Sequence, residues 1–252
     1  MANPVNPKAT GGAGTHFEHR VDAFFLAQLL TRGVAPFLPR CVVEGVHLQS
    51  GHLMWATDDL LVVACEPEQE LRKVAIQVKT GFVLSAKNDD CVETFTRAWQ
   101  DFSAPDRFDL SRDRLALVTD PASKKLQDGL RGLLDCVRSA VDAADFLRRL
   151  ALDGYWGKSA QDYGATIRQI LDDANGAAVT DDEFWRFLGV FDFAAFDLGT
   201  SGSLVEALLL TRLADTGGGG GQAASTWGEL IALAGLHAGK GESFRYDKLP
   251  SH

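Results

Sequence analysis

The sequence predicts an α/β protein in which helices flank a mixed central sheet and a mostly helical C-terminal extension follows. The sheet is predicted by two segments rich in apolar and β-branched residues, Leu60–Cys65 and Val74–Val78, which a charged turn, EPEQE, separates. Their nearly continuous apolar character is typical of strands buried on both faces. The helices are predicted by apolar residues that recur at helical spacing before these strands and again from about residue 158 onward.

The composition is that of an ordinary globular protein, with 252 residues, 46% of them hydrophobic and 23% charged. No run of about 18 apolar residues is present, so we expect no membrane-spanning helix. The first residues lack the apolar segment of a secretory signal. The four cysteines have no paired spacing, which favours reduced thiols and a cytoplasmic protein.

The net charge of −9 is unevenly distributed. Residues 1–84 carry 7 Lys/Arg against 8 Asp/Glu, whereas residues 85–252 carry 18 against 26. No basic face is evident, which disfavours a tight nucleic-acid binder that acts alone. An enzyme that meets DNA through a small local patch, or after assembly with a partner, remains compatible with this charge.

Residues 1–14 are rich in Pro, Gly and Asn and predict a flexible N-terminus, and a helix is predicted to follow from Thr15 to about residue 32. Thr15 and Glu18 stand three residues apart and match a capping box. Alternatively, Glu18 points toward the two apolar strands and offers a carboxylate to a metal. The sequence leaves both interpretations open.

Polar residues gather at one end of the predicted strand pair. Asp58 and Asp59 precede the first strand, and Gln77 and Lys79 close the second. If the hairpin is symmetric about Glu68, Asp59 lies opposite Gln77, with Cβ atoms roughly 5 Å apart. Gln77 and Lys79 are two residues apart and share a face. In this register one face of the pair carries a carboxylate, an amide and an amine, and a slip of one residue would destroy the arrangement.

The remaining elements follow from the same periodicities. Further strands are predicted at Cys41–Val43 and Leu115–Val118, and helices at residues 89–102 and, as one long amphipathic helix, at Ser123–Leu150. Helices are also predicted in YGATIRQILDDA, TDDEFWRFLGVFDFAAF and GSLVEALLLTRLA and at residues 225–236, with an unstructured glycine joint at 217–221. We therefore expect a core over residues 15–150 and a helical extension over residues 151–252.

Three segments in this order, GTHFEHRVDAFFLAQLL, TDDLLVV and AIQVK, resemble the double-stranded DNA endonuclease domain of Cap4-type bacterial antiphage proteins, within the PD-(D/E)xK superfamily. The resemblance covers residues 11–82 and continues as a looser helical similarity to about residue 250. It implies a restriction-endonuclease-like core and hydrolysis of phosphodiester bonds in double-stranded DNA with Mg²⁺ or Mn²⁺.

The resemblance also implies a defence effector that works as a homo-oligomer or together with a sensor or NACHT/STAND-type ATPase. We expect that the native protein continues beyond SFRYDKLPSH or pairs with a separate sensor.

The resemblance assigns a role to each polar residue. Asp59 is the first metal ligand, with Asp58 as a substitute, and Gln77 contributes its amide oxygen beside the Val78 backbone carbonyl. Lys79 holds or activates the attacking water and stabilises the developing negative charge.

Glu18 matches the family's helix carboxylate and is expected to bind the metal as well. The departure is Gln77, which stands where the superfamily usually has an acid, and a neutral ligand is expected to weaken metal binding. A catalytically weak or inactive nuclease fold that acts as a protein-interaction scaffold therefore remains an alternative, as does cleavage of RNA.

Overall fold

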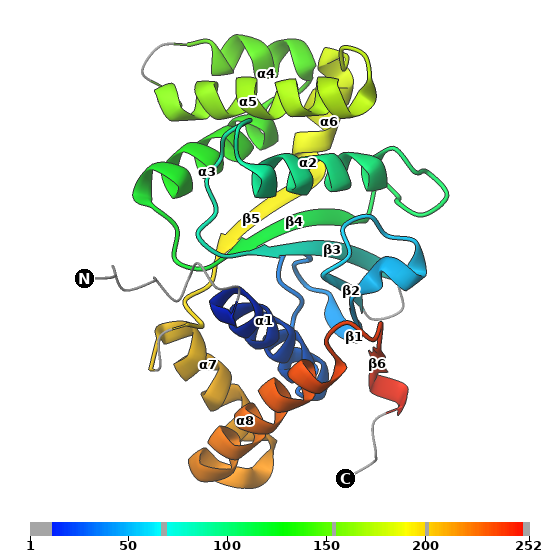
Figure 1. Ribbon diagram of the computed structural model, residues 1–252, viewed down its shortest axis with the longest axis vertical. Helices are drawn as coiled ribbons and strands as arrows, with labels where there is room; N and C mark the ends of the chain where they lie inside the picture. Colours follow the sequence, from blue (N-terminus) through cyan, green and yellow to red (C-terminus); the bar gives the residue numbers. More distant parts are fainter. Residues whose placement is uncertain (1–11, 67–69, 153–154, 200–201, 249–252) are drawn as a thin grey trace, which may run out of the picture.

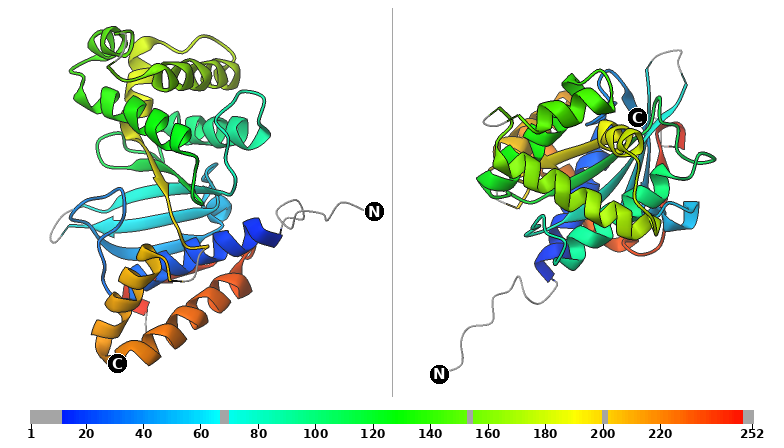
Figure 2. Two further views of the ribbon diagram at one scale, coloured as in Figure 1. Left: turned by 90° about the vertical axis from the view of Figure 1, so that its left-hand side faces the viewer. Right: turned by 90° about the horizontal axis from the view of Figure 1, so that it is seen from above.

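The computed structural model describes residues 12–66, 70–152, 155–199 and 202–248, and it has three layers (Figures 1 and 2). One face of the central sheet is covered by α1 (Gly12–Leu30), α7 (Leu204–Leu213) and α8 (Gly219–His237). On the other face, α2 (Asp89–Phe102), α3 (Lys124–Ser139) and α6 (Asp181–Val190) lie next to the sheet, and α4 (Ala143–Leu150) and α5 (Lys158–Asn175) pack on the outside of these helices. No helix in the described ranges is long and apolar enough to cross a membrane.

The sheet is mixed and open. Its strands are β1 (Val42–Leu48), β2 (Leu60–Cys65), β3 (Arg72–Lys79), β4 (Arg114–Thr119), β5 (Phe191–Ala195) and β6 (Ser243–Arg245), in the order β5-β4-β3-β2-β1-β6. β1, β2 and β3 are antiparallel neighbours, whereas β4 runs parallel to β3 and β5 runs parallel to β4. The α/β class, with helices on both sides of a mixed sheet, is confirmed. Short 3₁₀ turns at Ser50–Leu53 and Tyr246–Lys248 complete the described elements.

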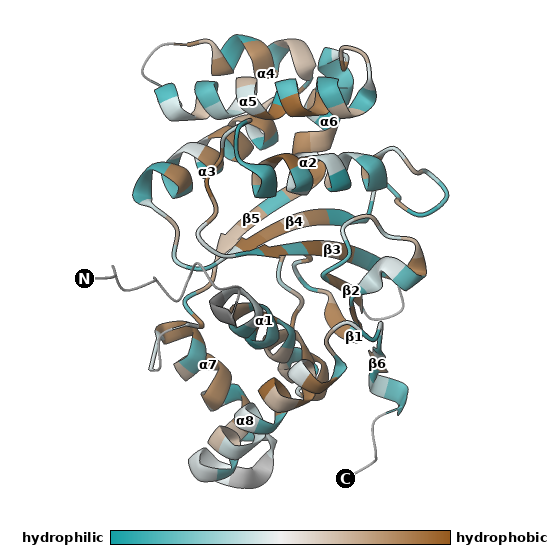
Figure 3. Ribbon diagram, viewed as in Figure 1, coloured by the Kyte–Doolittle hydropathy of each residue, from teal (hydrophilic) through white to brown (hydrophobic). Residues whose placement is uncertain are grey.

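Two apolar clusters form the core, one on each side of the sheet. Leu61, Ala75 and Leu117 belong to the cluster under α2–α6, while Leu60 and Ile76 belong to the cluster over α1, α7 and α8. Successive strand residues are therefore buried on opposite faces, which explains the continuous apolar runs. Figure 3 shows hydrophobic residues along most of β3 and β4. Each fully buried Leu or Ile contributes about 1.5–3 kcal/mol to folding.

The predicted register of the hairpin is confirmed. Leu60 pairs with Ile76 and Val62 pairs with Val74, so the pairing is symmetric about residue 68, which itself lies outside the described residues. The strand predicted at Cys41–Val43 overlaps the start of a longer one, β1, which begins at Val42. Asp59, immediately before β2, consequently lies opposite Gln77 near the end of β3.

The single helix predicted over Ser123–Leu150 is wrong, because the chain forms two helices. α3 ends at Ser139, and α4 begins after Asp142, whose Oδ1 accepts a hydrogen bond of 2.7 Å from the backbone nitrogen of Asp145. The apolar periodicity continues across this break, although Val141, which lies in the break, is 79% exposed. The helix cap, and not the periodicity, sets the boundary.

The prediction of a helix through Phe191–Ala195 is also wrong. These residues form β5, which follows α6 directly and places Phe191 opposite Leu115 and Phe193 opposite Leu117 of β4. A phenylalanine-rich run fits both a helix and a strand locally, so long-range pairing decides between them. The C-terminal part is mostly helical, yet it supplies both outer strands of the sheet, β5 and β6.

The glycine-rich segment at 217–221 is helical and is not the predicted unstructured joint. A π-helical turn spans Ala214–Gly218, and α8 begins at Gly219, where the φ of 67° suits a residue without a Cβ. Each glycine costs about 1 kcal/mol in a helix. Burial of Trp227 and Ala234 as α8 packs on α1 and α7 offsets this cost. Of the predicted flexible N-terminus, residues 1–11 lie outside the described residues, and residues 12–14 begin α1.

Candidate functional site

The start of β2 and the end of β3 form the centre of the candidate site. Asp59 precedes β2, and its Oδ2 accepts a hydrogen bond of 2.7 Å from the backbone nitrogen of Val78. The same oxygen accepts a hydrogen bond from Nε2 of Gln77. The Asp59 carboxylate therefore extends the hydrogen bonding between β2 and β3 beyond their last paired residues, Leu60 and Ile76. This links it directly to the strand that ends in Lys79.

Glu18 reaches the same end of the sheet from α1. The predicted capping box is wrong, because α1 begins at Gly12 and Thr15 and Glu18 lie inside the helix. Oε1 of Glu18 accepts a hydrogen bond of 2.8 Å from Nε2 of Gln49, a residue in the left-handed conformation just after β1. Glu18 and Lys79 both line a polar cavity of about 240 Å³. Glu18 thus has the orientation toward the strand pair that the alternative interpretation predicted.

Lys79 connects this site to α2 on the other side of the sheet. Its Nζ lies 2.7 Å from Oε2 of Glu93 and 3.4 Å from Oδ1 of Asp90. Arg97, one turn further along α2, forms ion pairs with Glu93 at 2.8 Å and with Asp58. Asp58 is therefore engaged with a guanidinium, and Asp59 is the carboxylate that faces β3.

Asp22 is a site residue to which the sequence assigned no role. It lies one turn after Glu18 on α1 and is 2% exposed. Its Oδ1 is buried without a hydrogen-bond partner among the described residues, and so is Oε1 of Gln77. The signal that could have found it is an acid four residues after Glu18, in the apolar stretch between Val21 and Phe25.

Burial and mutual repulsion raise the pKa values of these acids. Burial raises the pKa of Asp59 to about 7, helped by the charge of Glu18 and opposed by the Val78 N–H. Burial, followed by the charges of Glu18 and Asp59, raises the pKa of Asp22 well above its ordinary value. Burial also raises the pKa of Glu18, opposed by its hydrogen bond from Gln49. The three groups therefore interact as one cluster.

Lys79 stays protonated in this environment. Burial acts to lower its pKa, but the hydrogen bond and charge of Glu93, with the charges of Asp59 and Asp90, outweigh burial and raise it. The hydrogen bond from Lys79 lowers the pKa of Glu93 in turn. The ammonium is therefore a permanent positive charge near neutral pH.

The donor set suits a hard divalent cation. Among the described residues, acids outnumber cations at this end of the sheet: Glu18, Asp22, Asp58, Asp59, Asp90 and Glu93 lie around Lys79 and Arg97, and Asp120 follows the neighbouring end of β4. No group of three or more His, Cys, Asp or Glu within the described ranges is arranged to hold a metal by itself. Mg²⁺ needs only one or two carboxylates, completed by waters and other oxygens. Asp59 and the buried, unpartnered amide oxygen of Gln77 match that requirement, with Glu18 as a further acid.

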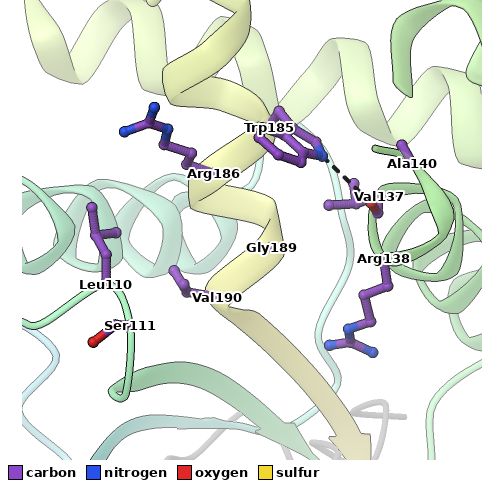
Figure 4. Close-up of a pocket in the computed structure, with 9 residues that line it drawn as sticks. All are labelled: Leu110, Ser111, Val137, Arg138, Ala140, Trp185, Arg186, Gly189 and Val190. Carbon is purple, nitrogen blue, oxygen red and sulfur yellow. Dashed lines mark hydrogen bonds between the residues drawn. The ribbon is translucent and has the colours of Figure 1, made fainter. Parts of the chain in front are cut away.

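A larger cavity of about 490 Å³ lies beside α6 and shares no residue with this site (Figure 4). Its lining is mainly apolar, and its polar groups have partners. Arg138 pairs with Asp192, and the indole nitrogen of Trp185 donates to the Val137 carbonyl oxygen at 3.4 Å. The smaller polar cavity is therefore the better candidate for chemistry, because its lining carries reactive groups.

No family model matches the chain, and no curated protein matches its sequence. Among solved structures, it is similar to the Cap4 SAVED/CARF-domain containing receptor of Moraxella osloensis, with 13% identity and a TM-score of 0.48 over 93% of this chain and 45% of that one. It is also similar to the Acinetobacter baumannii Cap4 SAVED/CARF-domain containing receptor with the cyclic trinucleotide 3'3'3'-cAAA, with 13% identity and a TM-score of 0.46 over 98% and 43% of the two chains.

The chain thus spans less than half the length of these receptors. Their names specify a receptor and no nuclease activity. Because both TM-scores are below 0.5, the function proposed next rests on the candidate site and on the sequence.

Proposed function

We propose that this chain is a metal-dependent endonuclease that hydrolyses phosphodiester bonds of double-stranded DNA, and that it acts in bacterial antiphage defence. The observation that supports the activity is the convergence of Glu18, Asp59, Gln77 and Lys79, from three separate segments, at one end of the sheet. The sequence resemblance to Cap4-type endonuclease domains supports the defence role. The restriction-endonuclease-like core is part of the same proposal.

Each residue has a role that follows from its environment. Asp59 and Gln77 would hold Mg²⁺ or Mn²⁺ through oxygen atoms, with Glu18 as an additional acid. When bound, such a cation neutralises charge on the phosphate and makes a water more acidic. Lys79, whose raised pKa keeps it protonated, stabilises negative charge that develops on the phosphate and does not accept a proton. Glu18, whose pKa burial raises above its ordinary value, would be the acceptor for the proton of the attacking water.

The cavity lining favours contact with the nucleic-acid backbone. Besides Glu18 and Lys79 it includes the hydroxyl-bearing Thr15 and Thr80, and none of the described residues that line it has an aromatic side chain on which a base could stack. Hydroxyl and ammonium groups are typical partners of phosphate oxygens, which carry no sequence information. We therefore expect cleavage with little dependence on base sequence.

The test is cleavage of supercoiled plasmid and of linear duplex DNA with Mg²⁺ or Mn²⁺, beside a labelled RNA and an EDTA control. Lys79→Ala and Asp59→Asn are expected to abolish cleavage. Lys73→Ala is the matched control, because it removes a half-buried lysine from the opposite end of β3, where Nζ donates to the Arg107 carbonyl oxygen at 2.9 Å. If Lys79→Ala and Asp59→Asn cleave like the wild type, the assignment of the site is wrong, and cleavage of RNA alone would change the substrate.

A protein-interaction scaffold is the second candidate, and one observation favours it. α7 exposes large apolar side chains, with Leu204 at 75% and Leu208 at 62% exposed. Together with the neutral Gln77, this fits a nuclease-like fold that binds a partner without catalysis. That function predicts no heat of Mn²⁺ binding in titration calorimetry and loss of the partner in Leu208→Ser, whereas the nuclease predicts metal binding that Leu208→Ser preserves.

A further inference from the structure

Asp22 is a buried acid whose Oδ1 has no hydrogen-bond partner in the part of the chain that the structure describes. It is 2% exposed, and none of the described residues donates a hydrogen bond to its Oδ1. Asp101, an equally buried acid, differs: its two carboxylate oxygens accept hydrogen bonds of 2.8 and 2.7 Å from the backbone nitrogens of Ala56 and Thr57. Asp101 therefore holds a loop in place, while Asp22 carries the cost of burial without a comparable contact.

The surroundings of Asp22 increase that cost. The charges of Glu18 and Asp59 both act on it, and both have the same sign. Such an arrangement is costly, and either protonation of the acid or a nearby positive charge relieves it. Among the described residues, three acids, Glu18, Asp22 and Asp59, thus gather at the inner side of the site, and the ammonium of Lys79 acts on Glu18 and Asp59.

A second, independent observation indicates what compensates this burial cost. Gln77 is 2% exposed and its amide contacts the Asp59 carboxylate, so its head group points into the cluster, yet its Oε1 has no partner among the described residues. An amide oxygen accepts hydrogen bonds or binds cations and cannot donate. Two buried oxygens that lack a donor among the described residues, one from a carboxyl group and one from an amide, thus belong to the same cluster as Asp59.

We propose that Asp22 is a positioning residue for the divalent cation and supplies, from α1, the negative charge that Gln77 does not supply from β3. Asp22 would stabilise a bound cation electrostatically, and its buried Oδ1 would be available to accept a hydrogen bond. This inference rests on the proposed metal-dependent function. It assigns to Asp22 the negative charge that an acid at the position of Gln77 would otherwise supply. It explains how a site with a neutral glutamine retains its affinity for metal.

The experiment measures Mn²⁺ binding by titration calorimetry and thermal stability in EDTA, without reference to cleavage. Asp22→Asn keeps the shape and removes the charge, so we expect about tenfold to a hundredfold weaker Mn²⁺ binding with unchanged or higher thermal stability. Asp22→Ser serves the same purpose if the asparagine variant fails to fold. Asp101→Asn, the matched control, is expected to lower thermal stability and to leave the Mn²⁺ affinity of the folded protein unchanged.

A rescue variant tests the exchange of charge directly. In Asp22→Asn combined with Gln77→Glu, the acid returns to the cluster from β3, and Mn²⁺ affinity is expected to recover to within a few-fold of the wild type. Equal affinity in the wild type and in Asp22→Asn would overturn the inference while leaving the proposed function intact. Absence of Mn²⁺ binding in the wild type would overturn both, and metal binding without cleavage would overturn the nuclease function alone.

Discussion

Replacement of Asp59 by asparagine is expected to change how stability depends on pH. Asp59 has a pKa of about 7 in the folded protein against an ordinary value of 3.8, because burial and the charge of Glu18 disfavour its ionised form. The folded state therefore binds this proton more tightly than the unfolded state. The contribution of Asp59 to stability is fully present below pH 3.8 and is lost as the pH rises through 7.

The magnitude follows from the difference between the two pKa values. A difference of about 3 corresponds to about 4 kcal/mol, since one pKa unit is about 1.4 kcal/mol. Asp59 as a residue is partly exposed, so screening by water makes this an upper bound. In Asp59→Asn the amide oxygen still accepts the hydrogen bond from Val78, and no charge develops. The variant should equal the wild type near pH 4 and exceed its stability by about 1–4 kcal/mol at pH 8.

The assay is urea unfolding in EDTA at a series of pH values from 4 to 8, followed by the fluorescence of the five tryptophans. The difference in unfolding free energy between the variant and the wild type is expected to grow steadily with pH. Leu208→Ser, at an exposed position on α7, is the control whose difference stays constant. If the two profiles of Asp59→Asn and wild type run parallel from pH 4 to 8, the carboxylate is not destabilised by burial, and the description of the site as a strained acid cluster is refuted.

Two further changes test the ion pair of Lys79 in the site and the packing of two helices in the core. Glu93→Gln removes the partner that most raises the pKa of Lys79, so that pKa should fall in an NMR titration of the lysine side chain, while Asp58→Asn, whose native carboxylate pairs with Arg97, should leave it unchanged. Gly129→Ala places a Cβ 2.7 Å from Cε2 of Tyr163 where α3 crosses α5, and this overlap should lower the unfolding free energy by about 1–3 kcal/mol in urea.

The strand pair and its register were predictable because both depend on neighbours in the sequence. The apolar runs define β2 and β3, and a short turn allows few registers, so Asp59 and Gln77 could be paired from their spacing alone. Glu18 was predictable only as one of two alternatives. Its orientation depends on where α1 begins, and the helix start at Gly12 excludes the capping box.

The other parts of the site depend on contacts between distant segments. The pairing of Lys79 with Glu93 requires α2 to pack across the end of β3, and nothing in either segment specifies that crossing. That Oδ1 of Asp22 finds no hydrogen-bond donor among the described residues depends on the surroundings of this side chain, which no local pattern encodes. β5 was missed for the same reason, since its strand conformation comes from pairing with β4, more than 70 residues earlier in the chain.

The strand order has a consequence for synthesis of the protein. Both outer strands, β5 and β6, come from the last quarter of the chain, whereas the residues of the candidate site lie between positions 18 and 97. During synthesis, β1–β4 therefore emerge from the ribosome while both edges of the sheet are still unpaired and α1 is not yet covered by α7 and α8. Exposed edges of this kind associate readily with other chains. The nascent protein thus passes through a stage in which the residues of the candidate site have been synthesised, while the strands that pair with the edges of the sheet and the helices that cover α1 have not.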